Sequence, residues 1–178
     1  MMNFTLRYIM LFILLSLING CGFHLRGVQP LTPSFKELYL KTPDPYGSLT
    51  HHLQQMLKLS GVHLVANPTD ASTILIILNE EKTQQLLSVG GTQETRQYNV
   101  GLNVTFEVQD SHHRILMPSQ TLTETRPITL RSNQILAGSN EINSLYEQMR
   151  QSMAYDIIIR LSAADASQAS THTPKATP

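Results

Sequence analysis

The sequence predicts an α+β fold, a two-layer sandwich in which two helices pack on one face of a mostly antiparallel, mixed four-stranded sheet. Several segments alternate apolar and polar residues with a period of two, as half-buried strands do. Two other segments repeat apolar residues at steps of three and four, as amphipathic helices do. The order β-α-β-β-β-α supplies two apolar helix stripes and one strongly apolar sheet face. Two layers are the simplest arrangement that buries all three.

The first part of the chain supplies one strand and one helix. Residues 35–42 (FKELYLKT) alternate, with Leu38 and Leu40 on one face. After the break at PDPYG, a helix is predicted over 45–60, where apolar residues recur at helical spacing at Leu49, Leu53, Met56 and Leu57. Gly61 follows, where a left-handed C-terminal cap is expected. A short extended return over residues 62–65 leads on to the next strand.

Three long strands are predicted next. TILIIL begins a buried strand that continues with more polar residues to Ser88, and the glycines of VGGT permit a hairpin turn. Residues 97–109 then alternate most clearly, with one face made of Tyr98, Val100, Leu102, Val104, Phe106 and Val108. After a turn at DSHH, residues 114–128 form a strand broken by Pro118. Strands of about 14 residues span roughly 45 Å and protrude beyond two helices, so their polar face is expected to contact another molecule.

The last ordered element is a second amphipathic helix over residues 140–161. Its apolar stripe consists of Ile142, Leu145, Met149, Met153, Ile157 and Leu161. Either Ser139 or Asn140 can cap its first turn. The chain then becomes rich in Ala, Ser, Thr and Pro without an apolar period, so we expect a disordered polar tail over 166–178.

The amino terminus is typical of a bacterial lipoprotein signal. One positive charge precedes YIMLFILLSL, about 10 apolar residues where a membrane-spanning helix needs about 20. The segment ends in LINGC, which has the lipobox pattern and contains the only cysteine, Cys21. We predict cleavage after residue 20, which leaves residues 21–165 as a single domain anchored by S-diacylglycerol and N-palmitoyl chains on Cys21. The alternative, a structural or reactive free thiol, fits this position less well, and no second cysteine is present to form a disulfide.

Charge and motifs argue against nucleic-acid binding and against catalysis. The first 20 residues hold one of the 13 basic residues and no acid, so the remainder has 12 basic and 13 acidic residues, a net charge of −1. A nucleic-acid-binding domain shows a clustered basic excess instead. Known nucleophile, phosphate-loop and metalloprotease motifs are absent from the sequence. His51-His52 project about 100° apart on a helix and His112-His113 lie in a predicted turn, so we expect no metal, no cofactor and no enzymatic activity.

Three arginines of the strand region are candidate anion contacts. Arg96, Arg126 and Arg131 carry guanidinium groups, which bind phosphate in a bidentate manner where geometry allows. The alternative is that they are solvated residues that keep strand edges soluble. The sequence leaves both interpretations open.

The residues from Cys21 to about Ser162 resemble the lipopolysaccharide-assembly lipoproteins of the outer membrane (LptE, formerly rare lipoprotein B). The resemblance is carried by CGFHLRG at the cysteine, a helix ending in LKLSGVHLV, a hairpin-rich middle and a final amphipathic helix. It implies a plug inside the lumen of a partner β-barrel, LptD, that helps the barrel assemble and assists insertion of lipopolysaccharide into the outer leaflet. Gly22, in place of an aspartate, fits sorting to the outer membrane, with the protein on its periplasmic side and in the barrel lumen.

The chain departs from this family at two places. Some members carry basic side chains in the hairpin loop and before the last helix, where this chain has Val89-Gly90-Gly91 and Ala137-Gly138. Either Arg96 and Arg131 take over the contact with lipopolysaccharide phosphates, or that contact is weaker here. Two other functions stay open: a stand-alone lipoprotein that binds a small ligand or chaperones an envelope component, and a lipid-anchored hydrolase.

Overall fold

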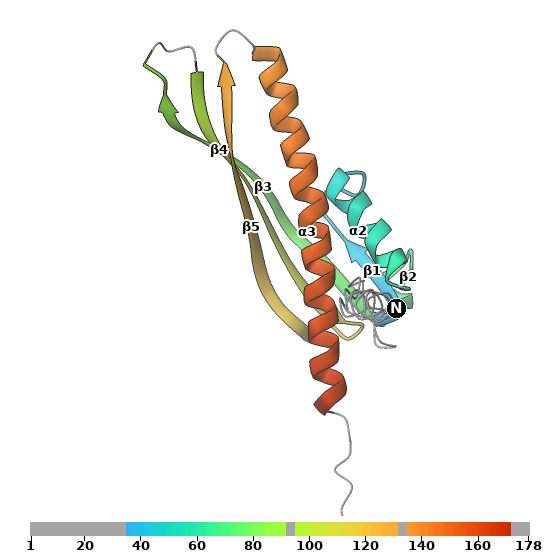
Figure 1. Cartoon of the computed structure of the whole chain (residues 1–178). Helices are drawn as coiled ribbons and strands as arrows, with labels where there is room; N and C mark the ends of the chain where they lie inside the picture. Colours follow the sequence, from blue (N-terminus) through green and yellow to red (C-terminus); the bar gives the residue numbers. More distant parts are fainter. Residues whose placement is uncertain (1–34, 92–94, 132–134, 172–178) are drawn as a thin grey trace, which may run out of the picture.

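The computed structural model describes residues 35–91, 95–131 and 135–171. The elements in chain order are β1 (Glu37–Lys41), α2 (Ser48–Leu59), β2 (His63–Leu64), η3 (Pro68–Asp70), β3 (Thr73–Val89), β4 (Thr95–Asp110), β5 (Ile115–Arg131) and α3 (Ile135–Thr171). The strands form one sheet in the order β2-β1-β3-β4-β5, parallel from β2 to β3 and antiparallel from β3 to β5. Both helices pack on one side of this sheet, which confirms the two-layer α+β prediction (Figure 1).

The sheet has five strands where four were predicted. The short return contains β2, whose two residues pair in parallel with β1 through Glu37↔His63 and Leu38↔Leu64. Two residues are too few to show a period, so the pattern could not identify them as a strand. Pro118 was predicted to break β5, and this is wrong. The strand continues through Pro118, and only its pairing with β4 becomes irregular there.

The hydrophobic core lies between the helices and one face of the sheet. On β4 the five residues Val100, Leu102, Val104, Phe106 and Val108 are all fully buried, as their alternation predicts. They meet the apolar stripes of α2 (Leu49, Leu53, Leu57) and of α3 (Met149, Met153, Ile157, Leu161). Each fully buried side chain of this size contributes about 1.5–3 kcal/mol relative to an exposed one.

The opposite, open face of the long strands is polar. The three strands present cross-strand rows on this face, among them Gln85/Asn99/Pro127, Glu81/Asn103/Thr123 and Asn79/Thr105/Thr121. Gly101 lies at the centre of another row, between Thr83 and Thr125. A Cβ atom at Gly101 would lie 2.3 Å from Oγ1 of Thr83 and 3.3 Å from Cγ2 of Thr125, which explains a glycine inside a long strand.

The long strands extend well past α2. β1 pairs with β3 only as far as Ile76, while β3 has 17 residues and spans roughly 56 Å. Its upper half continues with β4, β5 and α3 beyond the end of α2 (Figure 1). The long strands therefore protrude beyond α2, as predicted, but the prediction that they pass both helices is wrong, because α3 runs beside them to their ends (Figure 1).

Helix α3 is longer at both ends than predicted. It begins at Ile135, so neither Ser139 nor Asn140 is its N-cap, and it continues to Thr171, which corrects the predicted disordered tail over residues 166–171. Alanine is frequent here and the next proline is Pro174, so local propensity permits helix although no apolar stripe continues. In the part of the chain that the structure describes, no helix is long and apolar enough to cross a membrane.

Two turns follow the sequence predictions. Gly61 has φ +80°, the left-handed cap expected after α2. The β4–β5 turn is organised by Asp110, whose Oδ1 accepts the main-chain N–H groups of His112 and Arg114, each at 2.8 Å. Its Oδ2 accepts Nε of Arg114 at 2.6 Å.

We expect this turn to make stability depend on acid pH. Burial alone raises the pKa of Asp110, but the hydrogen bonds from Arg114 and His112 outweigh it and hold the pKa below the usual 3.8. A group with a lowered folded pKa stabilises the fold above its unfolded value, and this contribution is lost as pH falls through the folded value. In urea unfolding, the midpoint difference between the unmodified chain and Asp110→Asn should therefore shrink below pH 3.8. A difference that stays constant down to the lowest pH would contradict this role.

Candidate functional site

The three candidate arginines do not gather at one place. Arg96 opposes Leu130, which packs against the core, so Arg96 lies on the helix side of the sheet. Arg131 opposes Thr95, one residue along, and therefore lies on the open face. Neither side chain has an ion pair or a side-chain hydrogen bond within the described ranges. These two arginines remain accessible at the hairpin end of the sheet.

Arg126 lies on the helix side and is held by neighbouring side chains. Its Nε and Nη2 donate to Oε1 of Glu124 at 2.9 and 2.6 Å, and its Nη1 donates to Oε1 of Gln148 on α3 at 3.2 Å. Three of the five guanidinium N–H groups are thereby used. Arg126 thus links β5 to α3 and offers fewer donors to an external phosphate than Arg96 or Arg131.

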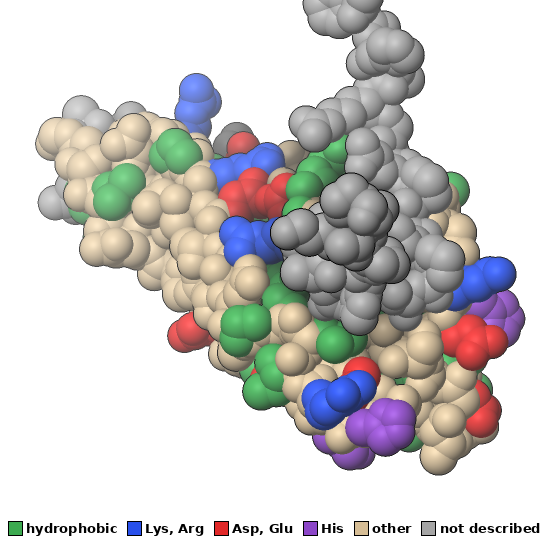
Figure 2. Space-filling model, turned by 90° about the horizontal axis from the view of Figure 1, so that it is seen from below, with side chains coloured by type: hydrophobic (Ala, Val, Ile, Leu, Met, Phe, Trp, Pro, Cys, Tyr) green, Lys and Arg blue, Asp and Glu red, His purple; other side chains and the backbone are tan. Residues whose placement is uncertain are grey.

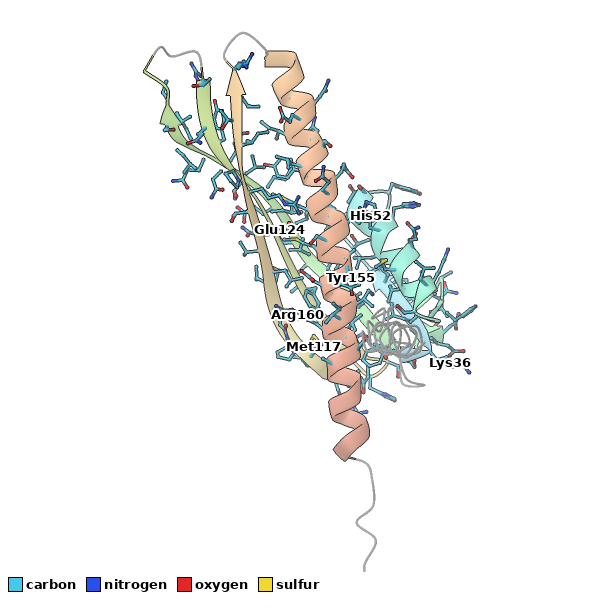
Figure 3. The ribbon with its side chains drawn as sticks, viewed as in Figure 1. Lys36, His52, Met117, Glu124, Tyr155 and Arg160 are labelled. Atoms are coloured by element: carbon cyan, nitrogen blue, oxygen red, sulfur yellow. The ribbon has the colours of Figure 1, made fainter. Side chains whose placement is uncertain are left out.

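A second hydrogen bond joins α3 to β5 lower down. Nη1 of Arg160 donates to Oε1 of Gln120 at 2.6 Å. Figure 3 shows Arg160 and Glu124 at two heights along the contact between helix and sheet. The long helix is therefore held to the outer strand by polar contacts at both levels, in addition to the apolar core.

A partly buried ionic cluster joins α3 to β3 and α2. Arg150 is 8% exposed, and its Nε donates to Oε1 of Glu80 at 2.8 Å. Its Nη1 also contacts Glu147, which in turn accepts the hydroxyl of Ser48 at the start of α2. The pKa of Glu147 lies below its usual 4.5. The hydrogen bond from Ser48 lowers this pKa most, and Arg150 lowers it further, while burial raises it. Sequence reasoning missed this cluster because its members come from three elements.

We expect Arg150→Ala to lower the free energy of unfolding by about 2 kcal/mol, because it leaves Glu80 without its buried partner. This loss of unfolding free energy is smaller than that for a fully buried ion pair, since the side chains of Glu80 and Glu147 are 23% and 51% exposed. Chemical unfolding followed by circular dichroism measures the loss. Arg114→Ala is the matched control, because it removes an ion pair whose arginine is 78% exposed. Equal losses in both variants would argue against a special role for the cluster.

Charge is dispersed over the face of the molecule seen from below (Figure 2). On the face seen from below, Lys and Arg side chains lie singly or beside acidic ones and form no continuous basic patch (Figure 2). This distribution agrees with the near-zero net charge of the sequence.

The other candidate residues are placed as follows. His51 and His52 are neighbours on α2 with ring centroids 6.3 Å apart, and His112 and His113 lie at the β4–β5 turn. Among the described residues, no group of three metal-binding side chains is present. Cys21 and the cleavage site before it lie outside the described residues, so lipidation stays a prediction.

Comparison with known proteins gives consistent matches. A family model described as lipopolysaccharide-assembly, LptE, matches residues 35–161. The chain is 30% identical over 153 residues to the LPS-assembly lipoprotein LptE of Yersinia enterocolitica, covering 84% of this chain and 72% of the relative. Identity to the LptE protein of Pectobacterium atrosepticum is 28% over 155 residues, covering 84% and 80%.

Solved structures share the fold. A solution structure of lipoprotein B from Nitrosomonas europaea aligns with a TM-score of 0.68 at 23% identity, covering 85% of this chain and 97% of that one. A crystal structure of a minor lipoprotein from Acinetobacter baumannii aligns with a TM-score of 0.61 at 25% identity, covering 84% and 100%. The family model covers the described domain from Phe35 to Leu161, and on that match this chain belongs to the LptE family of lipopolysaccharide-assembly lipoproteins.

Proposed function

We propose that this chain is the non-enzymatic plug subunit of the lipopolysaccharide translocon. In this proposal it is anchored to the outer membrane through Cys21 and lies in the lumen of the partner β-barrel, LptD. There it helps the barrel assemble and assists insertion of lipopolysaccharide into the outer leaflet. Membership of the LptE family supports the general role in lipopolysaccharide assembly.

The observation that carries the plug role is the long polar open face of β3, β4 and β5. A small domain needs neither strands of 16 and 17 residues nor a sheet that protrudes past one of its two helices. The side chains on this face are mostly Thr, Asn and Gln, which form hydrogen bonds without carrying charge. The interior of a large barrel is polar and hydrated, so such a surface can lie inside it without an apolar mismatch.

Arg96 and Arg131 support a contact with lipopolysaccharide phosphates. Both are exposed at the hairpin end, where the family's basic positions are replaced by uncharged residues in this chain. Their free guanidinium groups can form charge-assisted hydrogen bonds with phosphate oxygens. Their positions on opposite faces of the sheet favour two separate contacts over a single bidentate site.

The test is an affinity purification of the tagged mature lipoprotein from detergent-solubilised outer membranes. We expect one large β-barrel protein to co-purify in near-equal amount. Recovery of the lipoprotein alone would overturn the plug role. Lipopolysaccharide binding is then measured for the variants Arg96→Ala and Arg131→Ala and for the control Lys58→Ala. The control removes an exposed charge at the far end of α2. A loss confined to the arginine variants is expected, and equal binding in all variants would exclude the phosphate contact.

A further inference from the structure

The upper half of β3 is an uncovered edge of the sheet. β1 pairs with β3 only from Thr73 to Ile76, and β4 occupies the other side of β3 throughout. No strand within the described ranges pairs with the outer side from Leu78 to Val89. The carbonyl of Thr83 accepts the hydroxyl of Tyr146 at 3.0 Å, so α3 packs against β3 at that level. Beyond it, every residue of Gln84–Val89, here called the free edge, is exposed.

Two hydrogen bonds show which main-chain groups of the free edge point outward. In an antiparallel pair, alternate residues direct both N–H and C=O away from the neighbouring strand. The N–H of Asp110 on β4 donates to the C=O of Arg114 at 2.9 Å, so Asp110 and every second residue back to Val100 face β5, and Asn99 faces β3. Gln85, the partner of Asn99, is therefore directed inward, and Gln84 and Leu86 are directed outward. At the upper end the N–H of Gly90 donates inward to Thr95 of β4 at 2.8 Å, which agrees with this alternation and makes Val89 outward-facing. Gln84, Leu86 and Val89 therefore present main-chain donors and acceptors that a further strand can use.

The side chains of the free edge do not discourage pairing. Leu86, Leu87 and Val89 are 49%, 52% and 48% exposed, although large apolar side chains are usually buried. The free edge contains no charge and no proline, whereas the other outer strand, β5, carries two prolines. Proteins usually block a free edge with charge, proline or a bulge, and here only the irregularity between Leu86 and Ser88 is present. An apolar, uncharged edge of this kind is suited to being covered in the assembled protein.

We propose that the free edge accepts an extended segment of the enclosing barrel protein as an additional β-strand. This inference rests on the proposed plug function and specifies how the two proteins contact each other. The expected segment is uncharged and pairs through main-chain hydrogen bonds, with apolar side chains beside Leu86, Leu87 and Val89.

The length of the free edge decides between the barrel protein and a second copy of this chain. Six paired residues extend over roughly 20 Å, and such an edge buries far less than the ~1,200 Å² that two independent proteins need for a stable complex. A second copy held by this edge alone would dissociate. A protein that already surrounds the chain holds its segment nearby at an effective concentration of about millimolar, so a short edge is sufficient.

Amide hydrogen exchange, measured on the lipoprotein alone and on the purified barrel complex, tests the proposal. We expect the amides of Gln84 and Val89 to exchange about tenfold or more slowly in the complex, because new hydrogen bonds protect them. The inward amide of Gln85 serves as the internal control, since β4 protects it in both samples. Unchanged exchange at Gln84 and Val89 in the complex would overturn the proposal. So would protection that appears in the lipoprotein alone at high concentration, because the occupant would then be a second copy.

A pair of variants adds an independent readout. Gln84→Pro removes the outward N–H and leaves the pairing with β4 intact, while Gln84→Thr changes the side chain and keeps the N–H. We expect about tenfold less barrel to co-purify with Gln84→Pro than with Gln84→Thr. Equal recovery with both variants would contradict the proposal. Failure of the unmodified chain to recover any barrel would instead reject the plug function, so the two failures are distinguishable.

Discussion

A Phe106→Ala variant is expected to lose about 3–4 kcal/mol of unfolding free energy. Phe106 is 0% exposed and lies on the central strand β4, opposite Ile77 of β3 and Gln120 of β5. Truncation removes the transfer free energy of the ring and leaves a cavity that neighbours on two strands and a helix fill only partly. Domains of this kind are stable by about 5–15 kcal/mol, so the loss is a large fraction of the total. The chain has no tryptophan, so unfolding in urea is best followed by far-ultraviolet circular dichroism.

The matched control is Ile115→Ala on β5, which truncates an apolar side chain that is 62% exposed. We expect this variant to lose only about 0.5 kcal/mol, because little buried surface disappears and no cavity forms. A similar loss in both variants would mean that the helix side of β4 is not the main core of the domain.

The long strands and the core were predictable from sequence because each apolar position repeats the same physical requirement. A strand with one buried face must place an apolar residue at every second position, and β4 does so from Val100 to Val108 without exception. The stripe of α3 is equally regular from Met149 to Leu161. Over such lengths the period identifies both the element and the face that is buried.

Element ends and short elements were not predictable in the same way. β2 has two residues, and only its pairing with β1 identifies it as a strand. The ends of α3 lie beyond its apolar stripe. There the sequence offers only local helix propensity, which does not define the residue at which a helix begins or ends. The Ser139-Asn140 signal therefore suggested a start that lies inside the helix.

The roles of the candidate site residues depend on contacts between residues far apart in the sequence, which a single sequence does not reveal. Arg126 was a candidate anion contact by residue type, but Glu124 and Gln148 use most of its donors. The free edge of β3 is likewise a consequence of strand order, because β1 inserts beside β3 and stops at the level of Ile76. An alternating pattern identifies the faces of a strand and gives no information about which of its edges is covered.

A chain with Cys21→Ala is expected to move from the membrane to the soluble periplasmic fraction. The predicted diacylglycerol is attached through the thiol of Cys21, and each buried methylene group of such a chain contributes about 0.8 kcal/mol to membrane binding. A single myristoyl chain gives a binding constant of only about 10⁴ M⁻¹, so stable anchoring requires the several chains that Cys21 is predicted to carry. Detergent phase partitioning, together with the mass of the N-terminal peptide, measures the loss of lipid directly.

Lipidation and signal cleavage are both predicted to depend on Cys21, so the experiment must separate them. In the alanine variant, residues 1–20 are therefore replaced by an ordinary secretory signal, while Gly22→Ala behind the native leader keeps the thiol and serves as the control. Continued membrane association of the alanine variant, without lipid, would place the anchor elsewhere. Both proteins should unfold at the same urea concentration, because residue 21 precedes the matched domain at 35–161. If the soluble variant still recovers the barrel at near-equal amount, the protein contacts alone hold the plug and the lipid mainly delivers it to the membrane.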